Sequence, residues 1–433
     1  MKYFSIINNT FHNIILFLTI FSIGYQDFFL KKYIGEIGRS PIILLFPLFL
    51  LYNLIKQTKI DKTKSYFFFL FLIPILTSSY FYLYTIITNY SYIEFSTIIK
   101  TIKLSLYFFV ILNLFIFLTN QNTLKLMKYT FYTTIIYSII FIIEVVYLKV
   151  LNNPTAFSLI HISDEYRRVR LLTAEASWAG LVYIIYISIS IYYLKNFVKR
   201  NRFYLYIMYL LLVSFLYFSS SKGLLILYPL VILIAILFNK KISLIYKIII
   251  IILMIFALII FIKPILFNLF LSDIEAFSSV AVRSSSIITS IFMIIENPFG
   301  YGFGFHKIFM EFSFKYIDLI QQKIDIHGFN TVLSLIENND ETYTIKSGIL
   351  KYIVITGLFG VFILKKIYYV YKFKLNIISN HKGFFFLETA FYFMILSIIF
   401  YLDFLIKYEI VLLLSVIYKV CKNERNKLYL HRY

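Results

Sequence analysis

Cysteine is almost absent from this 433-residue chain. The single thiol, Cys421, lies in a basic C-terminal tail and has no partner, so no disulfide can link two segments of one chain. Charged residues are also scarce, at 15% of the chain, whereas 61% of the residues are hydrophobic. A water-soluble domain of this length does not have such a composition or a mean hydropathy of +0.83. The composition predicts a protein that folds in lipid.

Several motifs of soluble enzymes are missing as well. The chain has no cluster of His, Cys and Asp at metal-ligand spacing, no Walker loop, no Gly-x-Ser-x-Gly elbow and no Asp-x-Asp pair. The glycine-rich stretch 296–306 permits tight turns but lacks the strand-then-helix setting of a nucleotide loop. We therefore expect no hydrolase, ATPase or zinc enzyme, and neither a metal nor a cofactor.

Long apolar segments recur along the whole chain, separated by short polar breaks. Most are long enough to cross a hydrocarbon core of ~30 Å as a helix. Backbone groups in lipid must be hydrogen-bonded within the protein, so helices are predicted even where β-branched and aromatic residues dominate. The predicted fold is all-α: a polytopic membrane protein in which residues 1–433 form one membrane domain. The twelve predicted spans are 11–30, 41–55, 66–86, 104–120, 129–148, 171–194, 203–220, 223–239, 248–272, 348–367, 386–402 and 405–419.

The excess of basic residues, 42 Lys and Arg against 21 Asp and Glu, follows the breaks between spans. Lysine and arginine in short loops are retained on the cytoplasmic side, so every second break should be basic if both termini are cytoplasmic. We interpret this charge as a topology signal and expect no nucleic-acid partner. Lys31, Lys32 and Arg39, in the first outward loop, are exceptions to the pattern. The basic residues of the inward segments include Lys56, Lys64, Lys125, Lys128, Lys195, Lys199, Lys240, Lys247, Lys366, Lys372, Lys382 and Lys422.

This topology leaves two notable outward segments. One covers residues 149–170, and a longer one covers residues 272–347. Within the longer segment, 287–295 and 305–320 carry apolar residues at mixed three- and four-residue spacing with charges between them. Helices that lie on a membrane surface have this pattern. We expect a partly helical, extracytoplasmic cap over the outer ends of the bundle.

Charges without a topological reason gather at the start of the predicted span 171–194. Arg167, Arg168 and Arg170 crowd its outer mouth, and Glu175 is predicted to sit a turn or more into the span, where a charge is costly. Because the planar guanidinium matches phosphate oxygens, the arginines favour a phosphorylated lipid head group. A structural ion pair between Arg170 and Glu175 is the alternative. Trp178 is expected to pack or to anchor the interface.

Three further outward residues are candidates for a site. Lys222 lies in a short turn between two spans, and capping that turn is its simpler role. Arg283 lies near the start of the long segment, where an ordinary surface arginine is the alternative. His327, later in that segment, can act as a base near neutral pH, although a surface histidine is as good an interpretation.

The order of these residues resembles the bacterial O-antigen polymerase and ligase superfamily, a group of multispanning membrane glycosyltransferases of the GT-C type. The resemblance covers about residues 165–365, and Lys222 stands where such sequences commonly have arginine. The residues that carry it are Arg170, Glu175-x-Ser177-x-Ala179, Ser221-Lys222-Gly223, Arg283, Glu296-x-Pro298-x-Gly300-x-Gly302, His327 and Gly357-x-x-Gly360.

The resemblance implies a metal-independent polymerase of the bacterial inner membrane that joins repeat units carried on undecaprenyl diphosphate. Donor and acceptor are both lipid-linked glycans, and a chain-length regulator is a further partner that it suggests. The product would be O-antigen, capsule or exopolysaccharide. Arg170 and Arg283 would bind the pyrophosphate with help from Lys222, Arg167 and Arg168 being secondary candidates. Glu175 and His327 are both candidates for the base.

The sequence is also compatible with two other functions. An O-antigen ligase uses the same donor with a lipid A core acceptor. A flippase for lipid-linked sugars belongs to a different class, but it needs no folded cap and should concentrate charge in a central cavity.

Overall fold

The computed structural model of this chain is helical in most of the part that it describes. That part comprises residues 2–56, 61–88, 95–153, 168–199, 201–219, 221–238, 243–257, 278–323, 326–338, 340, 343–402 and 407–430. Within these ranges no β-strand forms, and Gln26 and Thr173 make an isolated parallel bridge. The prediction of an all-α protein is confirmed.

The helices follow the apolar segments of the sequence. The first group is α1 (Lys2–Gly24), α2 (Lys31–Ile34), η1 (Gly35–Arg39), α3 (Ile42–Ile55), α4 (Lys62–Ile87), α5 (Phe95–Asn120), α6 (Thr123–Val145), η2 (Val146–Val150), α7 (Ala176–Phe197), α8 (Arg202–Phe218), α9 (Lys222–Phe238) and α10 (Leu244–Ala257). The second is α12 (Ser278–Glu296), η4 (Gly302–Gly304), α13 (Phe305–Lys315), α14 (Ile317–Lys323), α15 (Ile326–Glu337), α16 (Gly348–Thr356), α17 (Leu358–Ile377), α18 (Phe384–Phe400) and α19 (Tyr408–Leu430).

Four helices of the described part are long and apolar enough to cross a membrane. Side-chain oxygens of Asp61 and Asn122 cap α4 and α6 by accepting backbone N–H bonds of their first turns. Large apolar side chains such as Leu83 and Ile139 stay exposed on these helices, as expected where lipid covers the surface. These helices associate the protein with a membrane. They are Lys62–Ile87, Thr101–Asn120, Thr123–Val150 and Ala176–Phe197.

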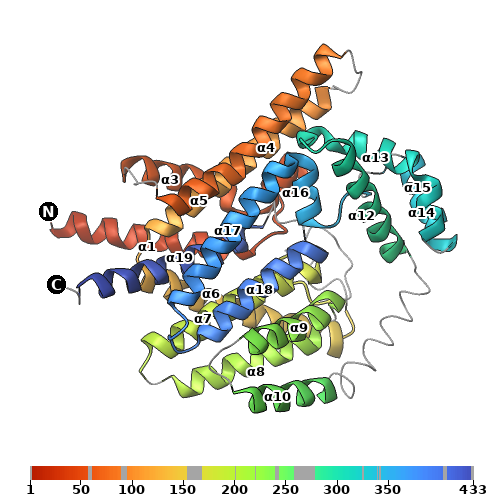
Figure 1. Cartoon of the computed structure of the whole chain (residues 1–433). Helices are drawn as coiled ribbons and strands as arrows, with labels where there is room; N and C mark the ends of the chain where they lie inside the picture. The colour runs from red at the N-terminus through yellow and green to blue at the C-terminus, as the bar shows by residue number, and fades with distance from the viewer. Residues whose placement is uncertain are drawn as a thin grey trace.

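Helix α7 lies at the centre of the bundle. It packs against α6, α18, α8 and α19, and 89% of the residues in its apolar stretch are buried. The helices α12 to α15 form a separate layer at one end, opposite the end where both termini lie (Figure 1). We call the end with α12–α15 the cap end and the opposite one the termini end.

Four predicted spans differ from the observed helices. The span 11–30 runs too far, because α1 ends at Gly24. The span 171–194 starts too early, because α7 begins at Ala176. The span 348–367 is wrong as a continuous helix, because the helix is interrupted at Gly357, between α16 and α17. The span 248–272 corresponds to α10 only as far as residue 257, and its remainder lies outside the described residues.

The break at Gly357 has a packing cause. Gly357 and Gly300 pass each other backbone to backbone, and Leu358 N–H donates to the Pro298 carbonyl at 2.9 Å. Gly357 has φ 63° and ψ −156°, a region open to glycine and very few other residues. A Cβ there would lie 2.2 Å from the Pro298 oxygen. The two glycine motifs thus join the loop before η4 to the start of α17.

We predict that Gly357→Ala destabilises the protein, since it combines backbone strain of about 1–3 kcal/mol with a backbone clash. Gly180→Ala is the matched control, because its Cβ would meet Leu224 only at an ordinary 3.4 Å. The midpoint of thermal unfolding in detergent should fall for Gly357→Ala and stay near the wild-type value for Gly180→Ala. Equal midpoints for the two variants would contradict the packing described.

Candidate functional site

A strained turn leads into α7 and sets the position of the predicted site. Leu171 has φ 51°, an unfavourable value for a residue with a side chain. Its N–H donates to Oε2 of the buried Glu144 at 2.8 Å, which ties the turn to α6. Thr173 donates from N and from Oγ1 to the Arg170 carbonyl, at 2.9 and 2.8 Å. The turn is therefore held from both sides.

This turn separates two residues that the sequence had placed together. Arg170 is buried, with 4% of its surface exposed. Glu175 is the N-cap residue of α7 and is exposed, so the prediction that it lies a turn or more inside a span is wrong. The turn delays the start of the helix and thereby keeps this carboxylate at the bundle end. Ser177 Oγ donates to its Oε2 at 3.1 Å.

The other predicted residues are described to different extents. Arg283 is exposed on α12, and Arg168 is exposed before the turn. Lys222 is the first residue of α9 and His327 lies in α15, but both side chains lie outside the described residues. Arg167 lies outside them entirely.

Gln26 connects the turn to the start of α19. Its backbone N–H donates to the Leu172 carbonyl at 2.8 Å. Its side-chain amide donates to Oε2 of Glu409 and accepts from Nζ of Lys407, the latter at 3.2 Å. All three side chains are buried, with 0% to 1% exposure. A buried charge needs such partners, and Gln26 supplies one acceptor and one donor to opposite charges.

Two cations contact the ring of Trp178, one turn after Glu175. The Arg39 guanidinium carbon lies 4.2 Å and the Lys407 nitrogen 3.1 Å from the ring centroid. Both cations are buried, whereas Trp178 is partly exposed. Cation–π contacts of this kind strengthen as water is excluded. Trp178 therefore holds positive charge at the N-terminus of α7, beyond the packing or anchoring role expected of it.

Sequence reasoning did not assign Arg39, Lys407 or Glu409 to a site. Arg39 stood out only as an exception to the loop charge pattern. Lys407 and Glu409 fell inside the predicted span 405–419. The available signal was a pair of opposite charges two residues apart at the mouth of an apolar span, which is costly unless the charges have partners.

Lys346, just before α16, is a further residue near the exposed Glu175 and Arg283. It is half-buried and lies within electrostatic range of Glu175, Arg283, Lys351 and Asp340. Burial lowers the pKa of the Lys346 ammonium group; Glu175 raises this pKa, and Arg283 lowers it. The predicted residues Glu175 and Arg283 thus both lie near Lys346, a lysine that the sequence did not indicate as part of a site.

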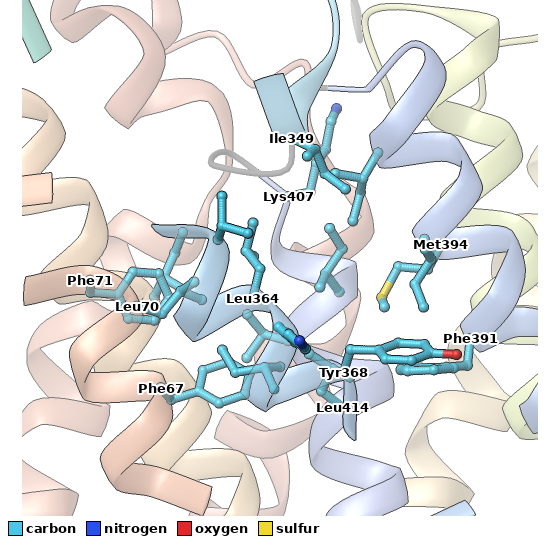
Figure 2. A pocket seen from close by; sticks show the side chains of 18 of the residues that line it. Phe67, Leu70, Phe71, Ile349, Leu364, Tyr368, Phe391, Met394, Lys407 and Leu414 are labelled. Carbon is cyan, nitrogen blue, oxygen red and sulfur yellow. The ribbon is translucent and has the colours of Figure 1, made fainter. Parts of the chain in front are cut away.

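An apolar cavity of about 340 Å³ is lined at one end by Lys407, which also belongs to the buried group around Gln26 and Trp178. Lys407 lies at one end of it and Phe67 at the other, with side chains of α4, α17, α18 and α19 between them (Figure 2). Its volume falls in the range of small-molecule pockets, ~300–1,000 Å³. Lys407 therefore contacts both the polar cluster and the cavity. Other lining residues include Leu70, Phe71, Leu364, Tyr368, Phe391 and Met394.

Comparison of the chain with protein-family profiles, curated proteins and solved structures finds no match. In the described ranges, no three His, Cys, Asp or Glu side chains are grouped so that they could hold a metal ion. The site is thus characterised by its own residues, which form two groups. The outer group has the exposed Glu175 and Arg283 and the half-buried Lys346 and Lys351; the inner group has the buried Gln26, Arg39, Lys407 and Glu409 and the partly exposed Trp178.

We predict that Lys346 loses its proton at lower pH than Lys315, whose pKa the hydrogen bond to Glu296 raises. Only the neutral amine is acylated, so labelling of Lys346 should begin at lower pH. Glu175→Gln removes a favourable charge and should shift the Lys346 profile to still lower pH, while Arg283→Gln should shift it upward. Peptide mass spectrometry after acylation across a pH series measures these profiles.

Lys307→Gln, an exposed change on α13, serves as the control and should leave the Lys346 profile in place. A Lys346 profile that does not move in either Glu175→Gln or Arg283→Gln would show that the three side chains are not neighbours.

Proposed function

We propose that this protein polymerises oligosaccharide repeat units carried on undecaprenyl diphosphate, at the outer face of a bacterial inner membrane. In this proposal the chain crosses the membrane twelve times, with α16 and α17 in place of the continuous span 348–367, and it has a GT-C-like fold and cytoplasmic termini. The cap end then faces outward, where the lipid-linked units are presented. The position of both termini opposite α12–α15 is compatible with this orientation (Figure 1).

One observation carries the proposal: an exposed carboxylate and several cations share one end of the bundle, next to an apolar cavity. Lys346 lies within electrostatic range of Glu175, of the cations Arg283 and Lys351, and of a second acid, Asp340. Lys407 and Arg39 add buried positive charge at Trp178. A ligand with an anionic head group, a polar glycan and a long hydrocarbon chain matches these three features.

The reaction assigns roles to Glu175, Arg283 and Lys346. A sugar hydroxyl of one lipid-linked unit attacks the anomeric carbon of another, and the bond from that carbon to the diphosphate oxygen breaks. Glu175 accepts the hydroxyl proton, and the lipid diphosphate leaves with the bonding electron pair. Arg283 and Lys346 stabilise the charge that develops on it, an effect commonly worth about 3 kcal/mol per donor.

Buried residues next to the reacting groups hold the turn before α7 and contact the lipid carrier. Arg170 lies too deep to contact a head group without movement, so we assign it to the structure of the turn before α7, beside Glu144. Lys407 lies where the head group meets the hydrocarbon chain. The first isoprene units of the carrier then occupy the cavity between α4, α17, α18 and α19.

The proposed topology predicts which sites react with a membrane-impermeant thiol reagent in intact spheroplasts. Starting from Cys421→Ser, single cysteines at Lys307 and Asp318 should be labelled from outside. Cysteines at Lys56, Lys199 and Lys372 should be labelled only after lysis. The reverse pattern, or labelling of both sets from one side, would contradict the twelve-span arrangement.

Complementation tests the activity itself. In cells that lack the gene, wild-type protein should restore a ladder of surface glycan. Arg283→Ala, Lys346→Ala and Glu175→Gln should each leave mostly single repeats, with losses of about 10²–10³-fold in polymer. The first two variants remove an interaction with the developing charge, and Glu175→Gln removes the base. Lys307→Ala removes a cation from the same end and should restore the ladder.

The phenotype of the deletion separates the candidate activities. A single-repeat glycan supports a polymerase, whereas lipid-linked polymer that is not attached to the core would indicate a ligase. Unchanged glycans in the deletion, or a full ladder from inserted Glu175→Gln, Arg283→Ala and Lys346→Ala, would overturn the proposal.

A further inference from the structure

A second pocket lies at the termini end, far along α7 from Glu175. It has a volume of about 540 Å³ and forms between two connections that are distant in sequence. The link from α7 to α8 contributes one wall, and the link from α17 to α18 contributes the other. The lining residues are Lys195, Val198, Lys199, Asn201, Lys382 and Gly383.

The two walls are tied together by specific contacts. Asn196 Nδ2 donates to the Lys382 carbonyl at 2.6 Å. The Lys195 nitrogen lies 5.7 Å from the ring centre of Tyr209 on α8 and 5.2 Å from that of Phe386 on α18. Gly383 adopts φ 75°, and a Cβ there would lie 3.0 Å from Lys195 Cδ. The lysine is thus held in the pocket by residues of both walls.

The pocket is strongly positive. Three of its six lining residues are lysines and none is acidic. The acidic residue Glu424, on α19, lies 3.4 Å from His381, which is adjacent to Lys382 in the chain. Glu424 does not line the pocket. Three like charges around one concavity repel each other, and an anion between them would relieve that repulsion.

Two helix N-termini add to this charge. Asn201 is the N-cap of α8 and Gly383 is the N-cap of α18, and both line the pocket. Neither helix has a side-chain cap, and Asn201 Nδ2 donates instead to the Leu194 carbonyl at 2.7 Å. Two first-turn N–H groups of α18, those of Phe384 and Phe386, already donate to carbonyls. The positive ends of the two helix dipoles favour a phosphate group in the pocket.

We infer that this pocket binds the phosphate head group of an anionic phospholipid from the adjoining leaflet. A lipid is favoured over a free anion because exposed aromatic side chains flank the pocket on α7 and α8: Phe197, Phe203, Tyr204 and Tyr206 are 46% to 71% exposed. Aromatic belts of this kind lie at the level of lipid head groups, and basic pockets between helices at that level recognise anionic lipids. The inference does not depend on the proposed polymerase activity.

Thermal unfolding of the full chain in lipid nanodiscs tests this site. Discs of phosphatidylcholine alone are compared with discs that also contain phosphatidylglycerol. The wild type should unfold several degrees higher in the anionic discs, because the lipid bridges the two connections. Lys195→Gln/Lys199→Gln/Lys382→Gln should lose most of that increment, while unfolding in phosphatidylcholine near the wild-type temperature or above it.

The control Lys56→Gln/Lys366→Gln/Lys372→Gln removes the same charge from exposed sites outside the pocket and should keep the increment. If both triple variants lose it equally, general attraction to the anionic surface explains the effect and the site is refuted. If inorganic phosphate added to phosphatidylcholine discs gives the wild type the full increment, the ligand is a free anion and the lipid assignment is overturned.

Discussion

The near-complete burial of α7 is the constraint on which the rest of the structure depends. Because 89% of the residues in its apolar stretch are buried, its neighbours α6, α8, α18 and α19 are held in fixed positions around it. The two ends of a helix held in this way are also fixed in position. Glu175 and Trp178 lie at the cap end and Lys195 lies at the termini end. Both sites described above therefore rest on one rigid element.

Buried charge at the cap end follows from the same packing. Where apolar helices meet and water is scarce, each charged group needs a partner within the protein. Gln26 meets this need by bonding both Lys407 and Glu409, and the Trp178 ring accepts Arg39 and Lys407. Charge is held in place before any ligand arrives, which is the property that electrostatic stabilisation of a leaving group requires.

Composition and apolar periodicity predicted the all-α class, most helix positions and a helical segment before α16, because solvent alone dictates these features. The late start of α7 could not be predicted, since the turn at Leu171 depends on Glu144, 27 residues earlier in the chain. The break at Gly357 depends likewise on contact with Pro298. Glu175 and Arg283 were singled out by their charge, whereas Lys346, Arg39 and Lys407 join the site only through tertiary contacts.

Reconstitution tests directly whether this protein forms glycosidic bonds between lipid-linked units. Purified protein in vesicles would be given a synthetic undecaprenyl-diphosphate-linked repeat unit as the only substrate, and the products would be followed by mass spectrometry. We expect glycans of increasing length on the carrier, with one undecaprenyl diphosphate released for each glycosidic bond formed. If the wild-type protein leaves the substrate unchanged, or moves it across the bilayer without forming glycosidic bonds, it is not a polymerase of these units.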